Sequence, residues 1–324
     1  ASESYIAARM LAMLSMAPNA IPGAEEKIAA IEREQGIRYA QKQKEAIQHA
    51  LEQGILILTG GPGTGKTTTL NAIIRLLQEA GERVFLAAPT GRAAKRMSEV
   101  TGEEAKTIHR LLQVDWDEKD NPVFTRNERN PLECDCLVVD ELSMVDAYVF
   151  ESLLRALPFS CRLVLVGDND QLPSVGAGNV LGDLIASGLF PTVQLKEIFR
   201  QSQESLIVMS AHRIVEGKLP DLRRHDSDFF FLPQEDPQKA AQLIVSLCSV
   251  RLPRSYGYSS VTDIQVLCPG RKGELGTVEL NKHLREAINP PARGKAEVKV
   301  NGALFRLGDK VMQIRNDYNL PWAE

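Results

Sequence analysis

The chain has 324 residues, of which 44% are hydrophobic and 25% are charged, and its formal net charge is −4 at pH 7. This length suggests about two domains of ~150 residues each, and the hydrophobic content is sufficient for well-packed cores. A net negative charge excludes a generally basic nucleic-acid binder, so any nucleic-acid surface must be a local patch.

Along the N-terminal residues one helical face is apolar, but Glu3 and Arg9 interrupt what would have to be a signal-peptide core. The residues of this face are Ile6, Ala7, Met10, Leu11 and Leu14. We therefore expect an amphipathic helix, no targeting or membrane segment, and a cytoplasmic protein. The cysteines are odd in number and lack metal-site spacing, which indicates buried free thiols in a reducing compartment. They are Cys134, Cys136, Cys161, Cys248 and Cys268.

A glycine-rich loop lies between an apolar run at 55–58 and a helix-compatible stretch at 68–74, and residues 60–67 read GGPGTGKT. Glycines let the backbone turn successive N–H groups inward around phosphate oxygens. Lys66 adds a positive charge for the β- and γ-phosphates, and we expect it to face solvent when the loop is empty. The Thr67 hydroxyl is placed to bind Mg²⁺. This strand, loop and helix predict a nucleoside triphosphate site, whereas a glycine-rich loop without them would be a tight turn. The predicted nucleotide ligands in the loop are Gly61, Pro62, Gly63, Thr64, Gly65, Lys66, Thr67 and Thr68.

Short β-rich runs alternate with helical ones through the first half of the chain. The predicted strands are 55–59, 84–88, 136–140 and 162–167, and the predicted helices are 67–80, 92–100 and 145–157. This alternation predicts an α/β fold with a parallel sheet, helices on both faces, and ligands outside the carboxyl ends of the strands. A weaker series, with strands at 263–268 and 309–315 and a helix at 277–288, indicates part of a second α/β domain. Strand residues flank a turn cluster at 114–124, which predicts a projecting hairpin.

Polar side chains follow two of the predicted strands. Asp140 and Glu141 end the strand before them, where Asp140 can hold Mg²⁺ and Glu141 can orient and deprotonate an attacking water. Gln171 follows the next strand and can hydrogen-bond the γ-phosphate or the water, which would let it report whether that phosphate is present. The alternative is that these strands end in polar residues by chance.

Short motifs are spaced along the chain from residue 36 to about 205. They are Gln43 in QKEA, the loop through Lys66 and Thr67, APTGRAA at 88–94, TIHRLL at 107–112, DELSM at 140–144, the 167–175 segment, and LKEIFRQ at 195–201. Their order is that of superfamily 1 DNA helicases, and the chain most resembles the RecD/TraA branch. Weaker similarity extends from 263 through 317.

The resemblance implies two RecA-like P-loop domains, the second incomplete, which bind ATP and Mg²⁺ at their interface and move 5′ to 3′ on single-stranded DNA. The implied segments are an N-terminal helical stretch at 1–35, a first domain at 36–190 with a hairpin insertion near 113–131, and a partial second domain at 191–324. The resemblance places this hairpin beside the emerging DNA strand, where it would meet the duplex fork; the alternative is an ordinary surface hairpin. Gln43 would read the adenine edge. Arg200, supplied by the second domain, would contact the γ-phosphate and stabilise transition-state charge, although without its motif it would be a surface ion-pair residue.

The resemblance also implies contacts with the DNA backbone, to which stacking of bases on aromatic rings would add affinity. The implied residues are Thr90, Gly91, Arg92, Thr107, His109 and Arg271, the last in the loop 269–273. Each has an alternative role as a helix cap, a turn residue or a solvated charge. His109 has no partner at metal-ligand spacing.

RecD-like helicases continue past the 309–314 segment into a small inserted barrel and further motifs, and we expect this chain to end before them. The leading interpretation is an ATP-driven DNA helicase that acts on single strands and on junctions between duplex and single strand, in a bacterial cytoplasm. One alternative is a nucleotide-dependent DNA-binding or assembly subunit without productive turnover. Another is an ATPase that acts on RNA. The protein partners and the pathway are not predicted by any residue pattern.

Overall fold

The computed structural model describes residues 2–116 and 122–312. The chain forms two compact units that divide between Phe230 and Phe231. No helix in the described ranges is long and apolar enough to cross a membrane.

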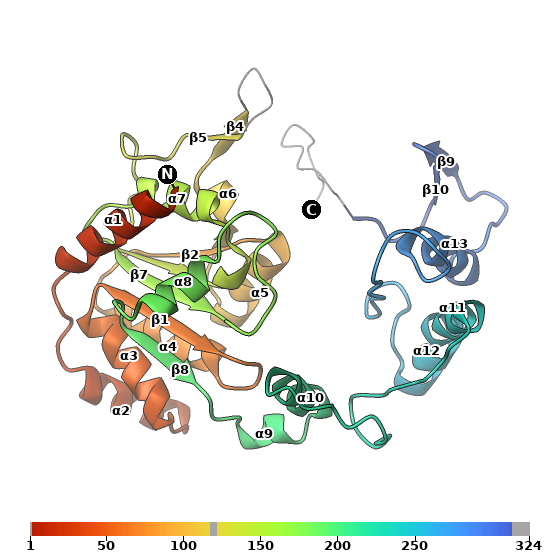
Figure 1. Cartoon of the computed structure of the whole chain (residues 1–324), viewed down its shortest axis with the longest axis horizontal. Helices are drawn as coiled ribbons and strands as arrows, with labels where there is room; N and C mark the ends of the chain where they lie inside the picture. The colour runs from red at the N-terminus through yellow and green to blue at the C-terminus, as the bar shows by residue number, and fades with distance from the viewer. Residues whose placement is uncertain (1, 117–121, 313–324) are drawn as a thin grey trace. The chain divides into compact units, whose positions relative to one another are not determined.

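The first unit contains a six-stranded sheet, a separate hairpin and the helices around them (Figure 1). Its strands are β1 (Ile55–Gly60), β2 (Val84–Ala88), β3 (Ala105–Thr107), β4 (Val114–Trp116), β5 (Pro122–Phe124), β6 (Cys136–Val139), β7 (Arg162–Gly167) and β8 (Thr192–Leu195). Its helices are α1 (Ser2–Ser15), α2 (Ala24–Gln35), α3 (Gln41–Glu52), α4 (Lys66–Glu79), α5 (Gly91–Thr101), α6 (Ile108–Leu111), the 3₁₀ turn η1 (Leu142–Met144), α7 (Ala147–Ala156), α8 (Val180–Ser187), α9 (Arg200–Gln203) and α10 (Leu206–Val215).

The main sheet has the strand order β3-β2-β6-β7-β1-β8, and all its pairs are parallel. Successive residues of β1 point to opposite faces, so Ile55 and Ile57 enter one core while Leu56 and Leu58 enter the other. Both faces are therefore covered, which is why the central strands are continuously apolar. The predicted α/β fold with a parallel sheet is confirmed for this unit.

The first unit extends beyond the boundary expected at 190. The edge strand β8 pairs with β1, with Val193 beside Leu58, so it completes the first sheet. At the other end, α1 buries Ile6, Met10 and Met13 in the same core as Phe150 of α7, so the N-terminal helix is part of this unit. The amphipathic helix is confirmed, although the exposed residue Leu11 lies off its buried face.

The predicted hairpin is present. Strands β4 and β5 pair antiparallel, with Val114 opposite Phe124, and its tip at 117–121 lies outside the described residues. At its base, the Phe124 ring lies 5.7 Å from the ring of His109 and 6.3 Å from that of Tyr148. The hairpin is thus joined to α6 and α7 by a row of aromatic contacts.

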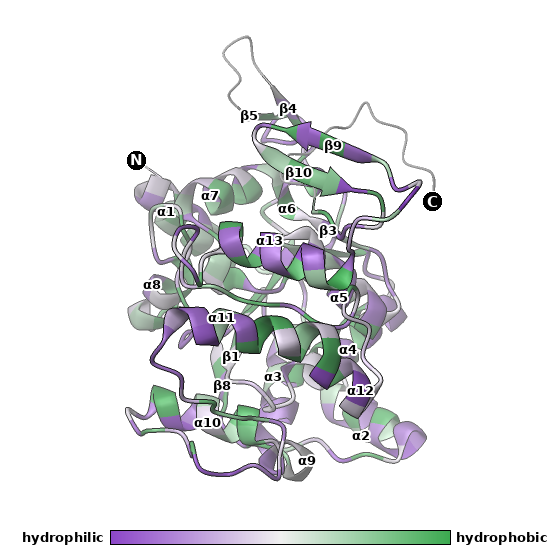
Figure 2. Ribbon diagram, turned by 90° about the vertical axis from the view of Figure 1, so that its right-hand side faces the viewer, coloured by the Kyte–Doolittle hydropathy of each residue, from purple (hydrophilic) through white to green (hydrophobic). Residues whose placement is uncertain are grey.

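The second unit is smaller and mostly helical. Its elements are α11 (Pro237–Ser246), the π-helical turn η2 (Leu247–Arg251), α12 (Leu252–Tyr256), α13 (Thr277–Ile288), β9 (Glu297–Val300) and β10 (Ala303–Arg306). Figure 2 shows hydrophobic and hydrophilic residues interleaved along α11 and α13. The predicted helix at 277–288 is confirmed.

All five cysteines of the chain are free thiols, and four of them are buried.

The strand predicted at 263–268 is wrong. Its residues form turns and irregular backbone, and Leu267 is 90% exposed. A strand requires a neighbour for its backbone hydrogen bonds, and the described residues of this unit pair only β9 with β10. The described part of the strand predicted at 309–315, residues 309–312, is also irregular, and residues 313–315 lie outside the described range.

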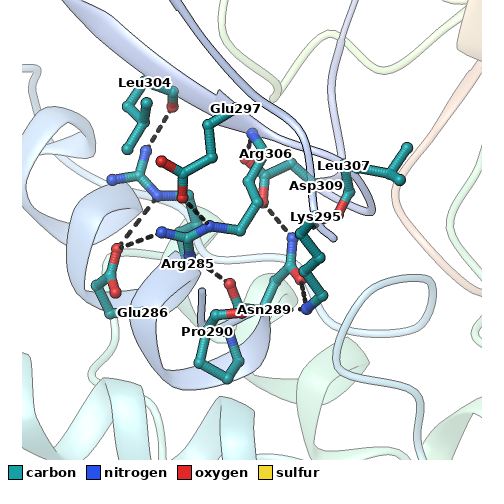
Figure 3. A network of polar contacts seen from close by, with 10 residues as sticks. All are labelled: Arg285, Glu286, Asn289, Pro290, Lys295, Glu297, Leu304, Arg306, Leu307 and Asp309. Carbon is teal, nitrogen blue, oxygen red and sulfur yellow. Dashed lines mark hydrogen bonds and ion pairs between the residues drawn. The ribbon is translucent and has the colours of Figure 1, made fainter. Parts of the chain in front are cut away.

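A buried arginine joins α13 to the β9–β10 hairpin (Figure 3). The guanidinium of Arg306 donates to Glu297 Oε1 at 2.6 Å and to Glu286 Oε1 at 3.3 Å, and it also donates to the carbonyl of Asn289. Its backbone N–H donates to Asp309 Oδ2 at 2.8 Å. These bonds satisfy a side chain that is only 5% exposed.

Candidate functional site

The predicted phosphate loop connects β1 to α4 at the carboxyl edge of the main sheet. Gly63 and Gly65 have φ values of 73° and 83°, in the left-handed region that favours glycine. A Cβ atom at Gly61, Gly63 or Gly65 would also lie 2.7 Å or less from a neighbouring side chain. The loop then opens into α4, a helix of 14 residues whose first residue is Lys66.

The Lys66 ammonium is folded into the loop. It donates a hydrogen bond to Gly61 O at 2.9 Å and another to Gly60 O, and the side chain is half-buried. Burial lowers the pKa of Lys66, and the negative charges of Asp168, Asp140 and Glu141 oppose that shift. Lys66 therefore places its charge where a helix N-terminus and a run of loop amides also favour an anion.

The residues of this loop fit a nucleoside triphosphate. Thr64 is buried and its hydroxyl donates to Gly61 O at 2.8 Å, which closes the loop on itself. Thr67 and Thr68 are exposed in the first turn of α4. Thr67 and Asp140 are the residues that would hold Mg²⁺, which in phosphate sites usually takes only one or two protein ligands and keeps waters and phosphate oxygens as the others.

Asp140 and Glu141 follow β6. In the sheet, β7 lies between β6 and β1, the strand that leads into the phosphate loop. Glu141 has a φ of 53°, a left-handed backbone that is uncommon for a residue with a side chain, and its N–H donates to Asp140 Oδ1 at 2.9 Å. Burial raises the pKa of Asp140. Burial, followed by the charge of Asp140, raises the pKa of Glu141. A strained backbone and two carboxyls with raised pKa values are typical of catalytic positions.

Gln171 lies beyond β7, on the same edge of the sheet. Its side chain is exposed and donates to Asp168 Oδ2 at 3.3 Å, while Asp168 itself is buried. A cleft of about 210 Å³ separates this region from α10, and it is lined by Gly61, Pro62, Asp168, Asp170, Gln171, Ala211, His212 and Val215. The structure thus brings Gln171 to the rim of the phosphate loop.

Gln43 is buried beside the loop. Its Oε1 accepts from the N–H of Ala40 at 2.9 Å, and its Nε2 donates to Gly65 O at 3.3 Å. The ring of Phe199 lies close to Gly65 and is 36% exposed. Sequence reasoning missed Phe199 because only the fold brings it to the loop.

Sequence reasoning assigned Arg200 to the site but missed the contacts that other residues of the segment 199–212 make with the loop. The N–H of Phe199 donates to Gly63 O at 3.2 Å, and His212 Nε2 lies 3.0 Å from Pro62 O. Arg200 begins α9 in the first unit, within the 191–324 range assigned above to the second domain, and its side chain lies outside what the structure describes.

The residues predicted to contact DNA lie in both units. Thr90 and Thr107 are the N-caps of α5 and α6, and each hydroxyl accepts a backbone N–H at 3.2 Å. Gly91 and Arg92 are exposed in the first turn of α5. Arg271 is exposed in the second unit, in the loop before α13. The two capping bonds give both threonines a structural role at the start of a helix.

Comparisons with known proteins match both units. A family model described as an AAA domain matches residues 43–177, and a model described as an ATP-dependent RecD-like DNA helicase SH3 domain matches residues 280–321. The chain is 38% identical over 284 residues to the ATP-dependent RecD2 DNA helicase of Deinococcus radiodurans, which covers 86% of this chain and 36% of that protein. It is 33% identical over 313 residues to the RecBCD enzyme subunit RecD of Mycolicibacterium smegmatis, covering 86% and 55% of the two chains.

This chain belongs to the RecD-like superfamily 1 helicases. It spans 36% and 55% of the lengths of these two relatives. Among solved structures, the Pif1 helicase from Candida albicans matches with a TM-score of 0.45 and 21% identity, covering 74% of this chain and 67% of that one.

Membership of the RecD-like family confirms the resemblance. The SH3 match corrects one expectation. We expected the chain to end before the small barrel that RecD-like helicases carry after the 309–314 segment. The SH3 match begins at residue 280, within α13, and runs to 321, so the barrel region starts before the 309–314 segment and these residues of the chain belong to it. The β9–β10 hairpin and the Arg306 network fall inside it.

Proposed function

We propose that this chain is the nucleotide-hydrolysing part of an ATP-dependent DNA helicase that moves 5′ to 3′ on single-stranded DNA. The observation that carries the proposal is the convergence of Lys66, Glu141 and Gln171 beyond the carboxyl ends of β1, β6 and β7. That edge is where parallel α/β sheets bind their ligands.

Each residue has a distinct part in this proposal. The loop amides and Lys66 would hold the phosphates, and Mg²⁺, held by Thr67 and Asp140, would neutralise charge on them. Glu141 would take a proton from the attacking water, and its raised pKa brings it nearer the optimum for a base at neutral pH. Gln171 would orient that water.

Two further roles follow from the family. Gln43 would read the adenine edge. Its amide bonds Ala40 and Gly65 with one lone pair and one N–H, and the second lone pair and second N–H would bond the base. Arg200, as the first residue of α9, would stabilise charge on the γ-phosphate in the transition state. We place hydrolysis at the interface of two RecA-like domains, in the arrangement that the RecD-like family implies.

The DNA would follow the α5 and α6 N-termini. Thr90, Arg92, Thr107 and His109 would contact backbone phosphates there, and Arg271 would contribute from the loop before α13. The two relatives are described as a DNA helicase and as a subunit of the RecBCD enzyme, which supports DNA as the substrate. The 5′ to 3′ direction and the preference for junctions follow from the family resemblance.

Steady-state phosphate release with and without single-stranded DNA tests the proposal. We expect ATP hydrolysis that DNA stimulates and that an RNA strand of the same sequence stimulates much less. DNA binding that depends on ATP, without any hydrolysis, would instead support a nucleotide-dependent assembly subunit. Equal stimulation by RNA would support an RNA-directed ATPase.

Duplexes with either a 5′ or a 3′ single-stranded overhang test direction in the full-length protein. Unwinding that requires the 5′ overhang is expected. A requirement for the 3′ overhang would contradict the proposed direction without affecting the assignment of the nucleotide site.

A further inference from the structure

His212 lies on α10 and faces the phosphate loop. Its Nε2 atom is 3.0 Å from the carbonyl oxygen of Pro62. Because a carbonyl only accepts, Nε2 must carry the hydrogen of this bond. The imidazole also lies directly against Gly61, since a Cβ atom on that glycine would be 2.7 Å from His212 Cε1.

The helix that carries His212 is held in place at its start. Ser205 caps α10 by accepting from the N–H of Val208, and its hydroxyl donates to Asp228 Oδ2. Asp228 Oδ1 also accepts from the N–H of Ile207 at 3.1 Å. His212 therefore contacts the loop from a helix whose start is fixed by hydrogen bonds.

The two contacts meet at residues 61 and 62, where Gly61 O also accepts hydrogen bonds from Thr64 and Lys66. Pro62 has no backbone N–H, so its carbonyl is its only polar backbone group. Gly61 has a backbone conformation that other residues can adopt, because its φ lies outside the left-handed region. Thr64 and Lys66 belong to the loop and to the start of α4, whereas the imidazole of His212 contacts residues 61 and 62 from α10.

We propose that His212 is a positioning residue of the nucleotide site. By donating to Pro62 and packing on Gly61, it holds the entrance of the phosphate loop in its binding conformation and connects that loop to α10. This inference rests on the proposed nucleotide site and adds a residue outside the predicted ligand set. His212 also lines the same cleft as Gln171, the predicted γ-phosphate sensor.

Variants at position 212 separate the hydrogen bond from the packing. Gln places an amide N–H near the position of Nε2, Phe keeps the ring without a donor, and Ala removes both. The affinity for a fluorescent ADP analogue is the readout, because it does not require turnover. We expect His212→Gln to bind within about twofold of wild type, and His212→Phe and His212→Ala to bind about 3- to 10-fold more weakly, the size of one net hydrogen bond.

Two controls accompany these variants. His225→Phe makes the same chemical change at an exposed histidine that precedes the second unit, and it should bind like wild type. Lys66→Ala should abolish binding. If wild type shows no Lys66-dependent binding, the proposed nucleotide site fails; if it does, and all three His212 variants bind like wild type, the positioning role alone is overturned.

A second pair of variants tests the contact with Gly61. Gly61→Ala adds a methyl group where the imidazole lies, so it should lower both the melting temperature and the nucleotide affinity. In a His212→Ala background the ring atoms that would lie nearest to the methyl group are absent, and the effect of Gly61→Ala should shrink. Non-additivity of this kind is the signature of direct contact. Equal effects of Gly61→Ala in the two backgrounds would contradict the contact.

Discussion

The ammonium of Lys66 donates a hydrogen bond to the carbonyl oxygen of Gly61 at 2.9 Å, within the loop that it would use to bind phosphate. The side chain is half-buried, and burial lowers its pKa. We had expected this lysine to face solvent in the free loop, on the basis of its position in the motif. Lys66 therefore makes a hydrogen bond within the loop in addition to its proposed role in binding phosphate.

Lys66→Ala should abolish nucleotide binding and hydrolysis while changing the free energy of unfolding by less than about 2 kcal/mol, because the lost hydrogen bonds are offset by relief of a buried charge. Urea unfolding and phosphate release measure the two effects. Turnover close to that of wild type would rule out the assignment of the nucleotide site.

Glu141→Gln should reduce hydrolysis by about 10²- to 10⁴-fold, since it removes a proposed general base while keeping its shape. ATP should still bind, and DNA affinity in the presence of ATP should persist or rise because the complex stops before hydrolysis. Fluorescence anisotropy of labelled DNA measures this. Loss of ATP binding would mean that Glu141 is structural.

The same substitution makes a prediction about pH and stability. The pKa of Glu141 is raised in the folded protein, so folding favours its protonated form. Its contribution to stability is therefore present below the unfolded pKa of about 4.3 and is lost as the pH rises through the higher folded value. Glu141→Gln should raise the melting temperature at pH 7, and the difference should shrink as the pH is lowered towards 4. A gain that is independent of pH would contradict the raised pKa.

Substitution of Arg162 tests how much a buried ion pair contributes to stability. Its side chain is 1% exposed, pairs with Glu82 at 3.0 Å, and also donates to the carbonyls of Ala50, Gln53 and Asn19. Arg162→Ala leaves these groups without their partner and should cost about 3–5 kcal/mol of unfolding free energy. Arg83→Ala, which breaks an exposed pair with Asp135, should cost about 0–1 kcal/mol. Similar costs for both variants would contradict the buried network.

The hairpin β4–β5 makes a separable prediction in the full-length protein. Replacing residues 115–124 with a glycine bridge should leave DNA-stimulated ATPase within a few-fold of wild type, because the hairpin lies on the chain between α6 and β6 and contributes no residue to the phosphate loop. Strand separation should fall strongly if the hairpin meets the fork as the family resemblance implies. Unwinding at the parental rate would show that it is an ordinary surface hairpin.

Sequence patterns predicted the parts of the fold that depend on local signals. Continuous apolar runs such as 55–58 are typical of strands buried on both faces, and the structure confirms each of them in the first unit. The strand predicted at 263–268 failed because alternation alone cannot supply a neighbouring strand. The extra edge strand β8 was missed for the converse reason, since its register against Leu58 depends on tertiary contact.

The candidate site shows the same division. Lys66, Glu141 and Gln171 follow strands, so sheet topology was enough to predict that they meet. His212 and Phe199 come from the segment after β8 and contact the loop only in the folded chain, and no periodicity or motif spacing indicates these contacts. Such residues are found only when the packing of α9 and α10 against the loop is known.

Equilibrium titration of this chain with a fluorescent ATP analogue and Mg²⁺ tests the central claim most directly, because it asks only whether the loop at 60–67 binds nucleotide. The account predicts saturable binding that weakens when Mg²⁺ is removed, is lost in Lys66→Ala and is retained in Glu141→Gln. Binding that is absent in wild type, or unchanged in Lys66→Ala, would contradict it.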